Sequence, residues 1–459
     1  MTRVRQAMFL AACGALLLFA PHASAQIQPA KPPRSLGDLL DPPLKPGEFP
    51  LPPEVDVAKA KAAGLRKIEG KQVTLWTDVP AAPDVDELAA VFDQAVPQWA
   101  AYFKINPPQT TRWKLVGYIV QDKEKFQRAE LFPDTLPPFL NGFQRGAEFW
   151  LYDQPGEYYR RHLLLHEGTH AFMSHFLGGG GPPWYSEGMA ELLATHQWKD
   201  GKLTLNVMPA TRDEVPYWGR VKIIKDAFAA GRGLLLTDVM KYDNQAHLKN
   251  EPYGWSWGAA YFCDRHPLTS AAFRELQKNV QERSIDFSKT FYDALGADQA
   301  AVNEDWMLFV NDIDYGYDVA RSAVVRKAAG PMPAKGAQAI VAADRGWQST
   351  GFQVVAGKKY QLAAKGKFQI GSQPKPLPCE ADGVTIHYYN GRPLGMLTAA
   401  IGDVVKSSGI SSLVNTIAVG KRGDLTPEVD GVLYLRINEA SSGLHDNAGS
   451  LTVDLRPAP

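Results

Sequence analysis

Cysteine is scarce in this sequence, with three residues in 459. So few cysteines exclude a small disulfide-stapled scaffold and a zinc ribbon held by four thiolates. An excess of one charge is also lacking, because 49 basic side chains face 49 acidic ones. This balance argues against a protein that binds nucleic acid through a strongly basic surface. At roughly 100–200 residues per domain, the length predicts two or three domains.

Long apolar runs are absent except at the start of the chain. Arg3 and Arg5 precede an apolar run over 7–20, and the small-x-small sequence 23–25 follows it. The run is shorter than the about 20 residues that cross a bilayer. We therefore predict a signal peptide over 1–25, and a secreted or periplasmic protein with no transmembrane segment. A lipoprotein signal ending at Cys13 is the alternative, although the apolar run continues past that residue.

Removal of the signal would leave 47 basic and 49 acidic side chains, a net charge of −2. Two cysteines would remain, Cys263 and Cys379. They fall in separate predicted domains, so we expect both to be unpaired.

The composition divides the mature chain into four segments. Nine prolines over 27–53 predict an extended leader, residues 26–53. Residues 54–320 mix helical and strand patterns, and 321–337 has the composition of a linker. Short alternating runs broken by glycine over 338–457 predict an all-β sandwich. We expect strands at 73–77, 114–120 and 148–152, and helices at 85–103, 158–177, 184–197, 217–230, 254–264, 268–282 and 298–312.

The strongest functional signal is an HExxH motif, His166-Glu167-Gly168-Thr169-His170. On a helix, positions i and i+4 share one face, so both imidazoles can reach the same metal ion. Glu167 lies beside the first ligand, where it can contact a metal-bound water. The alternative is an inert histidine pair on a core helix.

A catalytic zinc site needs a third protein ligand. Four glycines over 178–181 form a turn, and a second helix then carries Glu187 and Glu191 on one face. The spacing allows an antiparallel return, which places Glu187 as third ligand. Glu191, one turn further on, can accept a hydrogen bond from the free nitrogen of His166.

Three other histidines compete for the third position. His175 lies about 140° away from the ligand face of the first helix. A metzincin would need glycine at 173 and histidine at 176, where this chain has methionine and phenylalanine. His162 lies one turn before His166, where a structural or rim role is the simpler interpretation. His196 follows Glu187 by nine residues and could point in any direction.

Residues 163–195, with HEGTHAF followed by PPWYSEGMAELLAT, resemble gluzincin metallopeptidases of the MA-like clan. They are especially similar to a group of exported bacterial proteins of unknown function with that signature. The resemblance implies zinc, with His166, His170 and Glu187 as ligands and Glu167 as general base. It implies an α+β zincin-like catalytic domain over 54–320, built from a small mixed sheet plus helices.

The activity implied is peptide-bond hydrolysis by a zinc-bound water, with a peptide or protein as substrate. Related sequences have a tyrosine near the position of Tyr253, which we predict to stabilise the oxyanion. The alternative for Tyr253 is an aromatic cleft wall. Residues 146–152 could form the edge strand that pairs with an extended substrate, with Glu148 near the cleft. This favours an endopeptidase.

The C-terminal segment resembles the PA-I galactophilic lectin type of β-sandwich, above all in YLRINE over 434–439 and DNAGS over 446–450. In those lectins the corresponding loop binds calcium. The matching positions are Glu439, the Gly443 carbonyl, Asp446 and Asn447, and oxygen ligands of this kind suit Ca²⁺. The resemblance implies a carbohydrate ligand. The alternative is an accessory sandwich in which this loop only makes a turn.

Two function classes follow. The first is an exported zinc-dependent endopeptidase with a β-sandwich appendage. The second is a non-catalytic cell-envelope or carbohydrate-binding protein with a degenerate peptidase domain. The intact motif together with Glu187 favours the first, because a degenerate site tends to lose a ligand or the base.

Overall fold

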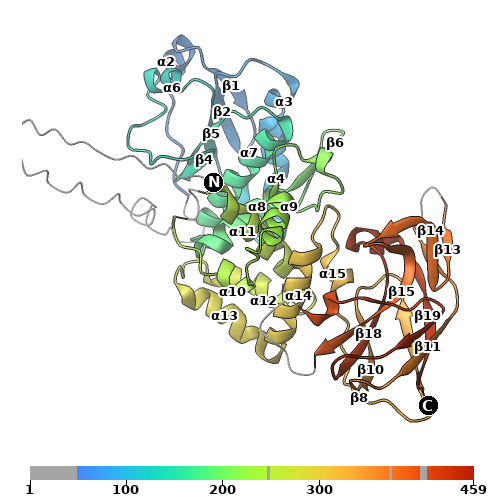
Figure 1. Ribbon diagram of the computed structural model, residues 1–459. Helices are drawn as coiled ribbons and strands as arrows, with labels where there is room; N and C mark the ends of the chain where they lie inside the picture. Colours follow the sequence, from blue (N-terminus) through green and yellow to red (C-terminus); the bar gives the residue numbers. More distant parts are fainter. Residues whose placement is uncertain (1–48, 246–248, 372–374, 404–410, 459) are drawn as a thin grey trace, which may run out of the picture.

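The computed structural model describes residues 49–245, 249–371, 375–403 and 411–458. The predicted signal peptide and most of the predicted leader lie outside these residues. The described chain combines helices with several sheets, and its C-terminal region is mostly strands (Figure 1). Within the described part, each helix is too short or too polar to cross a membrane.

The first sheet has five strands in the order β1-β2-β3-β5-β4. Its bounds are β1 (Arg66–Glu69), β2 (Val73–Thr77), β3 (Leu115–Val120), β4 (Gly142–Arg145) and β5 (Glu148–Tyr152). The strands β2, β3 and β5 run parallel, whereas β1 and β4 are antiparallel to their neighbours. The prediction of an edge strand over 146–152 is wrong, because β4 covers that side of β5. Glu148 instead accepts a hydrogen bond of 2.8 Å from the hydroxyl of Tyr118.

The sheet is buried on both faces, which agrees with its runs of apolar residues. One face, with Leu75 and Phe149, joins the main core formed with helices α4 (Leu88–Tyr102) and α7 (Glu157–Phe172). The opposite face, with Trp76 and Trp150, packs against α2 (Val57–Ala62) and α6 (Lys123–Arg128). Side chains alternate between the two faces along each strand, and α7 packs against the face that carries Leu75 and Phe149.

The remaining helices lie mostly after α7 in the chain. They are α3 (Pro83–Asp86), α5 (Pro107–Thr110), α8 (Pro183–Ala194), α9 (Arg220–Ala229), α10 (Leu236–Val239), α11 (Asn250–Arg265), α12 (Ser270–Glu275), α13 (Ile285–Leu295), α14 (Gln299–Asp312) and α15 (Val319–Ser322). Helix α8 packs against both α7 and α11. A glycine within the HExxH motif allows a close approach, since a Cβ on Gly168 would lie 2.6 Å from the ring of Trp99.

Several predicted helix ends differ from the structure; the helix predicted over 268–282, for example, ends at Glu275 and continues as a 3₁₀ turn, η4 (Leu276–Asn279). Two of these differences concern α7 and α8. Helix α7 stops at Phe172, and a π-helical turn, η1 (Met173–Leu177), leads to Gly178 in the left-handed region (φ 79°). Helix α8 stops at Ala194 rather than 197, because Thr195 is extended and its hydroxyl bonds back to the Glu191 carbonyl. The hairpin of β6 (His196–Lys199) and β7 (Lys202–Leu205) follows.

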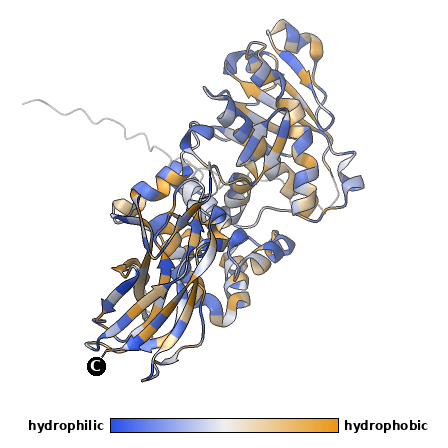
Figure 2. Cartoon of the chain, turned by 90° about the vertical axis from the view of Figure 1, so that its right-hand side faces the viewer, coloured by the Kyte–Doolittle hydropathy of each residue, from blue (hydrophilic) through white to orange (hydrophobic). Residues whose placement is uncertain are grey.

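The C-terminal region consists of two sheets that enclose a separate core. One has the order β14-β15-β18-β10-β8 with β16 beside β15, and the other has β13-β12-β19-β11-β17 with β9 beside β19. Along their strands, hydrophobic and polar residues alternate (Figure 2), as a sandwich requires. The bounds are β8 (Gly330–Pro331), β9 (Ala337–Ala342), β10 (Gln348–Val354), β11 (Tyr360–Lys365), β12 (Phe368–Ile370), β13 (Leu377–Cys379), β14 (Asp382–Tyr389), β15 (Arg392–Asp403), β16 (Ile417–Ala418), β17 (Arg422–Leu425), β18 (Gly431–Ile437) and β19 (Ala448–Pro457).

The two regions are in contact through their own small apolar cluster. Leu308 and Val324 pack there against Trp347 and Ala400. The segment 321–337, predicted as a linker, takes part in the sandwich, because β8 pairs in parallel with β10. The two described cysteines, one in each region, are both buried and free.

Candidate metal centre

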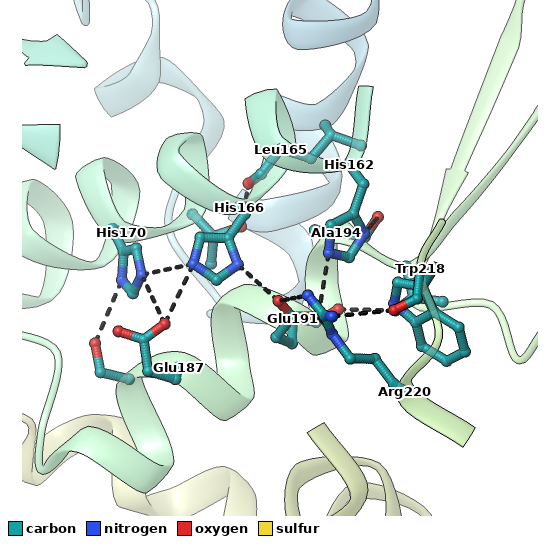
Figure 3. A network of polar contacts seen from close by, with 12 residues as sticks. His162, Leu165, His166, His170, Glu187, Glu191, Ala194, Trp218 and Arg220 are labelled. Carbon is teal, nitrogen blue, oxygen red and sulfur yellow. Dashed lines mark hydrogen bonds and ion pairs between the residues drawn. The ribbon is translucent and has the colours of Figure 1, made fainter. Parts of the chain in front are cut away.

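Two antiparallel helices supply the candidate ligands. Helix α7 carries His166 and His170 one turn apart, and the glycine-rich turn after η1 reverses the chain into α8. Pro183 begins α8, where a missing N–H costs nothing. Glu187, in the second turn of α8, then faces both imidazoles (Figure 3).

The three ligand atoms converge on one point. His166 Nε2 lies 3.1 Å from His170 Nε2 and 3.2 Å from Glu187 Oε2. His170 Nε2 lies 3.5 Å from Glu187 Oε2. Ligands at the usual bond lengths around tetrahedral zinc are separated by about 3.3 Å. The spacing of the three atoms therefore already suits such an ion.

The electrostatics of this cluster also fit a cation. Glu187 Oε2 is buried and makes no hydrogen bond of good geometry among the described residues. Burial alone would raise the pKa of Glu187, but His170 and His166 hold it well below its usual value. Burial would lower the pKa of His166, yet Glu187 and Glu191 together raise it well above its ordinary value. One carboxylate and two imidazoles are a donor set that zinc accepts.

Glu191 lies behind the ligands and is 1% exposed. Its Oε1 is 3.3 Å from His166 Nδ1, and its Oε2 is 3.1 Å from His162 Nε2. Arg220, at the start of α9, donates to both oxygens, from Nε to Oε2 and from Nη2 to Oε1, each at 2.8 Å (Figure 3). Arg220 could not be predicted from the sequence, because no motif marks an arginine 29 residues beyond its partner.

Glu167 is buried next to the ligands, with 5% exposure. Burial raises the pKa of this carboxyl group, while His166 and His170 oppose the rise. Strand β4 passes directly over it, since a Cβ on Gly142 would lie 2.4 Å from Glu167 Oε1. Gly142, the first residue of β4, is thus in contact with Glu167, the candidate general base.

A cavity of about 200 Å³ opens over the cluster. The segment that leads into β4 forms an apolar wall with Phe139, Leu140 and Phe143. Tyr253, near the start of α11, lines the same cavity, and its ring centre is 6.0 Å from that of His166. The guanidinium of Arg220 lies 5.7 Å from the centre of the Tyr253 ring.

The competing histidines lie elsewhere or serve other contacts. His175 is fully buried and accepts a hydrogen bond of 2.7 Å from the Trp113 indole. His196 stacks on Tyr158 and contacts the Ala194 carbonyl. His162 belongs to a second group of side chains that are close enough to hold a metal ion, with His166 and Glu191. The guanidinium of Arg220 on Glu191 disfavours a second cation there.

The predicted calcium loop lies at the edge of the sandwich. Glu439 and Asn447 are buried, and the Asn447 amide donates to Glu439 Oε2 at 3.0 Å and to the Ala343 carbonyl at 3.1 Å. Asn447 Oδ1 accepts from the Gly371 N–H at 3.2 Å. A Cβ on Gly443 would lie 2.3 Å from Glu439 Oε1, so a residue without a side chain makes room for this long carboxylate. Burial raises the pKa of Glu439, and its carboxylate is paired here with an amide.

Asp446 ends the short helix η7 (Ser441–Asp446) of the same loop. Its Oδ2 lies 4.0 Å from the position of a Cβ on Gly371. The four predicted calcium-binding positions are therefore close in the chain and in space, with Asn447 turned toward Glu439.

Comparisons with known proteins add little to this description. No family model matches the chain, and no curated protein matches it. The solved structures that match include one described as an EclA N-terminal domain, PllA-like lectin, at 19% sequence identity. The match covers 26% of this chain and 95% of that one, with a TM-score of 0.21.

Proposed function

We propose that the protein is a zinc-dependent peptidase of the gluzincin type, with a zincin-like catalytic region over 54–320. One observation carries the proposal. His166, His170 and Glu187 converge on one point, and Glu167 stands beside them on the floor of a cavity. Inert histidine pairs on core helices have no reason to lie 3.2 and 3.5 Å from a buried carboxylate oxygen that makes no hydrogen bond of good geometry.

The ion, when bound, supplies a water of lowered pKa and polarises the scissile carbonyl. Glu167 takes the proton of the attacking water and passes it to the leaving amine. Its raised pKa suits a group that must both accept and release a proton. Tyr253, which lines the same cavity, donates to the oxyanion that forms at the carbonyl.

The substrate is an extended peptide that pairs with β4. This strand is the outermost of the sheet on the side of the cavity, and its residues line that cavity. Edge strands bind extended chains through main-chain hydrogen bonds, and these bonds do not depend on the side chains of the bound peptide. Main-chain pairing of this kind favours cleavage within a chain, and thus an endopeptidase. The signal-like start of the sequence supports a secreted or periplasmic site of action.

The decisive experiment compares Glu167→Gln with the parent protein. We expect equal zinc content by metal analysis and loss of at least about 10³-fold in cleavage of a peptide library read by mass spectrometry. Glu157→Gln is the matched control, because Glu157 lies on the same helix and its side chain is 64% exposed. It should cleave like the parent.

Equal cleavage by Glu167→Gln and the parent would exclude Glu167 as the base. Zinc binding without cleavage of any peptide by the parent would favour the second class, a non-catalytic envelope or carbohydrate-binding protein.

A further inference from the structure

A second cavity, of about 260 Å³, lies where the helical region meets the sandwich. Its wall on the helical side is the end of α14, with Asn311 and Asp312. The opposite wall is formed by β15 and β18 of the sandwich. The cavity is therefore built by both regions and would not exist in either alone.

The alternation along β18 decides which side chains face this cavity. Leu433, Leu435 and Ile437 point into the core of the sandwich. Arg436 points to the opposite face, where Thr398 on β15 is its direct cross-strand neighbour. Both line the cavity.

The predicted calcium loop is not part of this site. Neither Glu439 nor Asn447 lines the cavity, and both are hydrogen-bonded to each other. The lining also contains none of the zinc-site residues. The cavity is thus a separate place, with its own chemistry.

The charged groups of the lining balance each other. Asp312 supplies one negative charge and Arg436 one positive charge. An anion such as phosphate would be repelled by Asp312, and a divalent cation by Arg436. The ligand that suits the cavity is therefore uncharged overall.

Arg436 is also held in a way that disfavours a zwitterion. Its Nη2 donates to the Glu439 carbonyl at 2.6 Å, and the guanidinium lies 5.3 Å from the centre of the Trp347 ring. With Nε directed to the Ile437 carbonyl at 3.4 Å as well, the Nε–Nη2 edge is occupied by main-chain carbonyls and is not available for a carboxylate.

The uncharged polar side chains of the lining are amides and hydroxyls, from Asn311, Asn390, Thr398, Thr416 and Asn438. Such groups both donate and accept, as the hydroxyls of a polyol do. Asp312 Oδ1 accepts a hydrogen bond of 2.5 Å from the side-chain amide of Asn311, and burial raises the pKa of this carboxyl group. A carboxylate has about four acceptor sites, so a hydroxyl group of a ligand can still donate to it. Leu308, Leu413 and Trp347 add apolar surface for the carbon skeleton.

We propose that this interdomain cavity binds a neutral polyhydroxylated molecule of monosaccharide size. Its volume equals that of about nine waters at ~30 Å³ each, which suits one sugar ring. Because the ligand contacts both α14 and β18, it also binds the two regions to each other.

The test is calorimetry of the full-length protein with glucose, galactose, mannose and N-acetylglucosamine, each offered separately. We expect at least one sugar to bind, and Asp312→Asn to weaken that binding at least tenfold. Asp314→Asn is the control, because Asp314 is exposed, pairs with Lys225 and does not line the cavity. It should bind like the parent. Thermal melting of both variants without sugar checks that each one folds.

Absence of binding for all four sugars would overturn the proposal. Binding that Asp312→Asn leaves unchanged would overturn it as well, and loss of that binding after removal of calcium would place the sugar at the 439–447 loop. Binding of glycine or alanine in place of the sugars would also overturn the proposal, because the ligand would then be a zwitterion and not a polyol. None of these results depends on zinc or on peptide cleavage, so the outcome is independent of the proposed activity.

Discussion

Arg220 holds Glu191 through two hydrogen bonds of 2.8 Å, and both side chains are buried. Two further N–H groups of the guanidinium are directed to the Trp218 carbonyl at 3.0 Å and to the Tyr159 hydroxyl at 3.4 Å. The pair fixes a negative charge 3.3 Å from His166 Nδ1. Carboxylates in this position fix the ring orientation of a metal-binding histidine and raise its basicity. We therefore predict that Arg220 acts on the candidate metal centre as a positioning residue.

Replacement of Arg220 by methionine should weaken the metal site from a distance. Glu191 would remain buried without its cation, so we expect a loss of about 3–5 kcal/mol in the free energy of unfolding. Zinc affinity should fall by about 10–100-fold, as measured by competition with a chelator. Arg220→Lys keeps the charge but not the two parallel bonds, so it should recover part of both losses. Full zinc affinity in Arg220→Met would contradict the positioning role.

Gly142→Ala should displace the side chain of Glu167, the candidate general base, and leave the fold intact. The Cβ of Gly142→Ala would meet the end of the Glu167 side chain, which can move aside at little cost. A displaced base costs on the order of 10²-fold in kcat/KM. We expect that loss in peptide cleavage, with zinc content and melting temperature nearly unchanged. Gly330→Ala, which has open space around its Cβ, serves as control and should match the parent.

The hydroxyl of Tyr253 should matter in the transition state more than in substrate binding. We expect Tyr253→Phe to lower kcat by about 10²–10³-fold with little change in KM, as for other oxyanion donors. Initial-rate kinetics on one defined peptide would show the split. Tyr388→Phe, at an exposed site in the sandwich, should have no effect. A change confined to KM would instead mark Tyr253 as part of the cleft wall.

The free energy of unfolding should decrease at acid pH because of His175. Burial lowers the pKa of this imidazole to about 4. The unfolded chain has a histidine pKa near 6.5, so below that pH it binds a proton that the folded protein does not. The stability that His175 contributes is complete above about pH 6.5 and is lost as the pH falls toward 4. From pH 7 to pH 5 this amounts to about 2 kcal/mol.

Chemical unfolding of His175→Gln at both pH values tests this. Glutamine can still accept from Trp113 but does not titrate, so the difference between the two pH values should shrink by about 2 kcal/mol. His387→Gln, at an exposed site, should leave the difference unchanged. An unchanged difference in His175→Gln would show that another group causes the acid sensitivity.

Much of the candidate site could be predicted because its information is local. His166 and His170 share a face through helical periodicity, and the glycine turn returns α8 within reach, so Glu187 and Glu191 follow from spacing alone. The strands at 73–77 and 148–152 were predictable for the same reason, since a short run of mostly apolar residues is visible within five residues. The helix end at Ala194 was not, because the hairpin that replaces the last turn depends on pairing between His196 and Leu205.

The sequence by itself thus determined the candidate ligand set, the two helices that carry it and the change to short strands after residue 337. Only the tertiary structure decided that β4 rather than β5 is the outer strand, because sheet order depends on packing between distant segments. It also decided that Arg220 pairs with the buried carboxylate of Glu191. It likewise decided that Asp312 and Arg436 line the same cavity. No sequence pattern marks either pair. Both a buried ion pair and a common cavity depend on which residues lie close together in three dimensions, and not on their spacing along the chain.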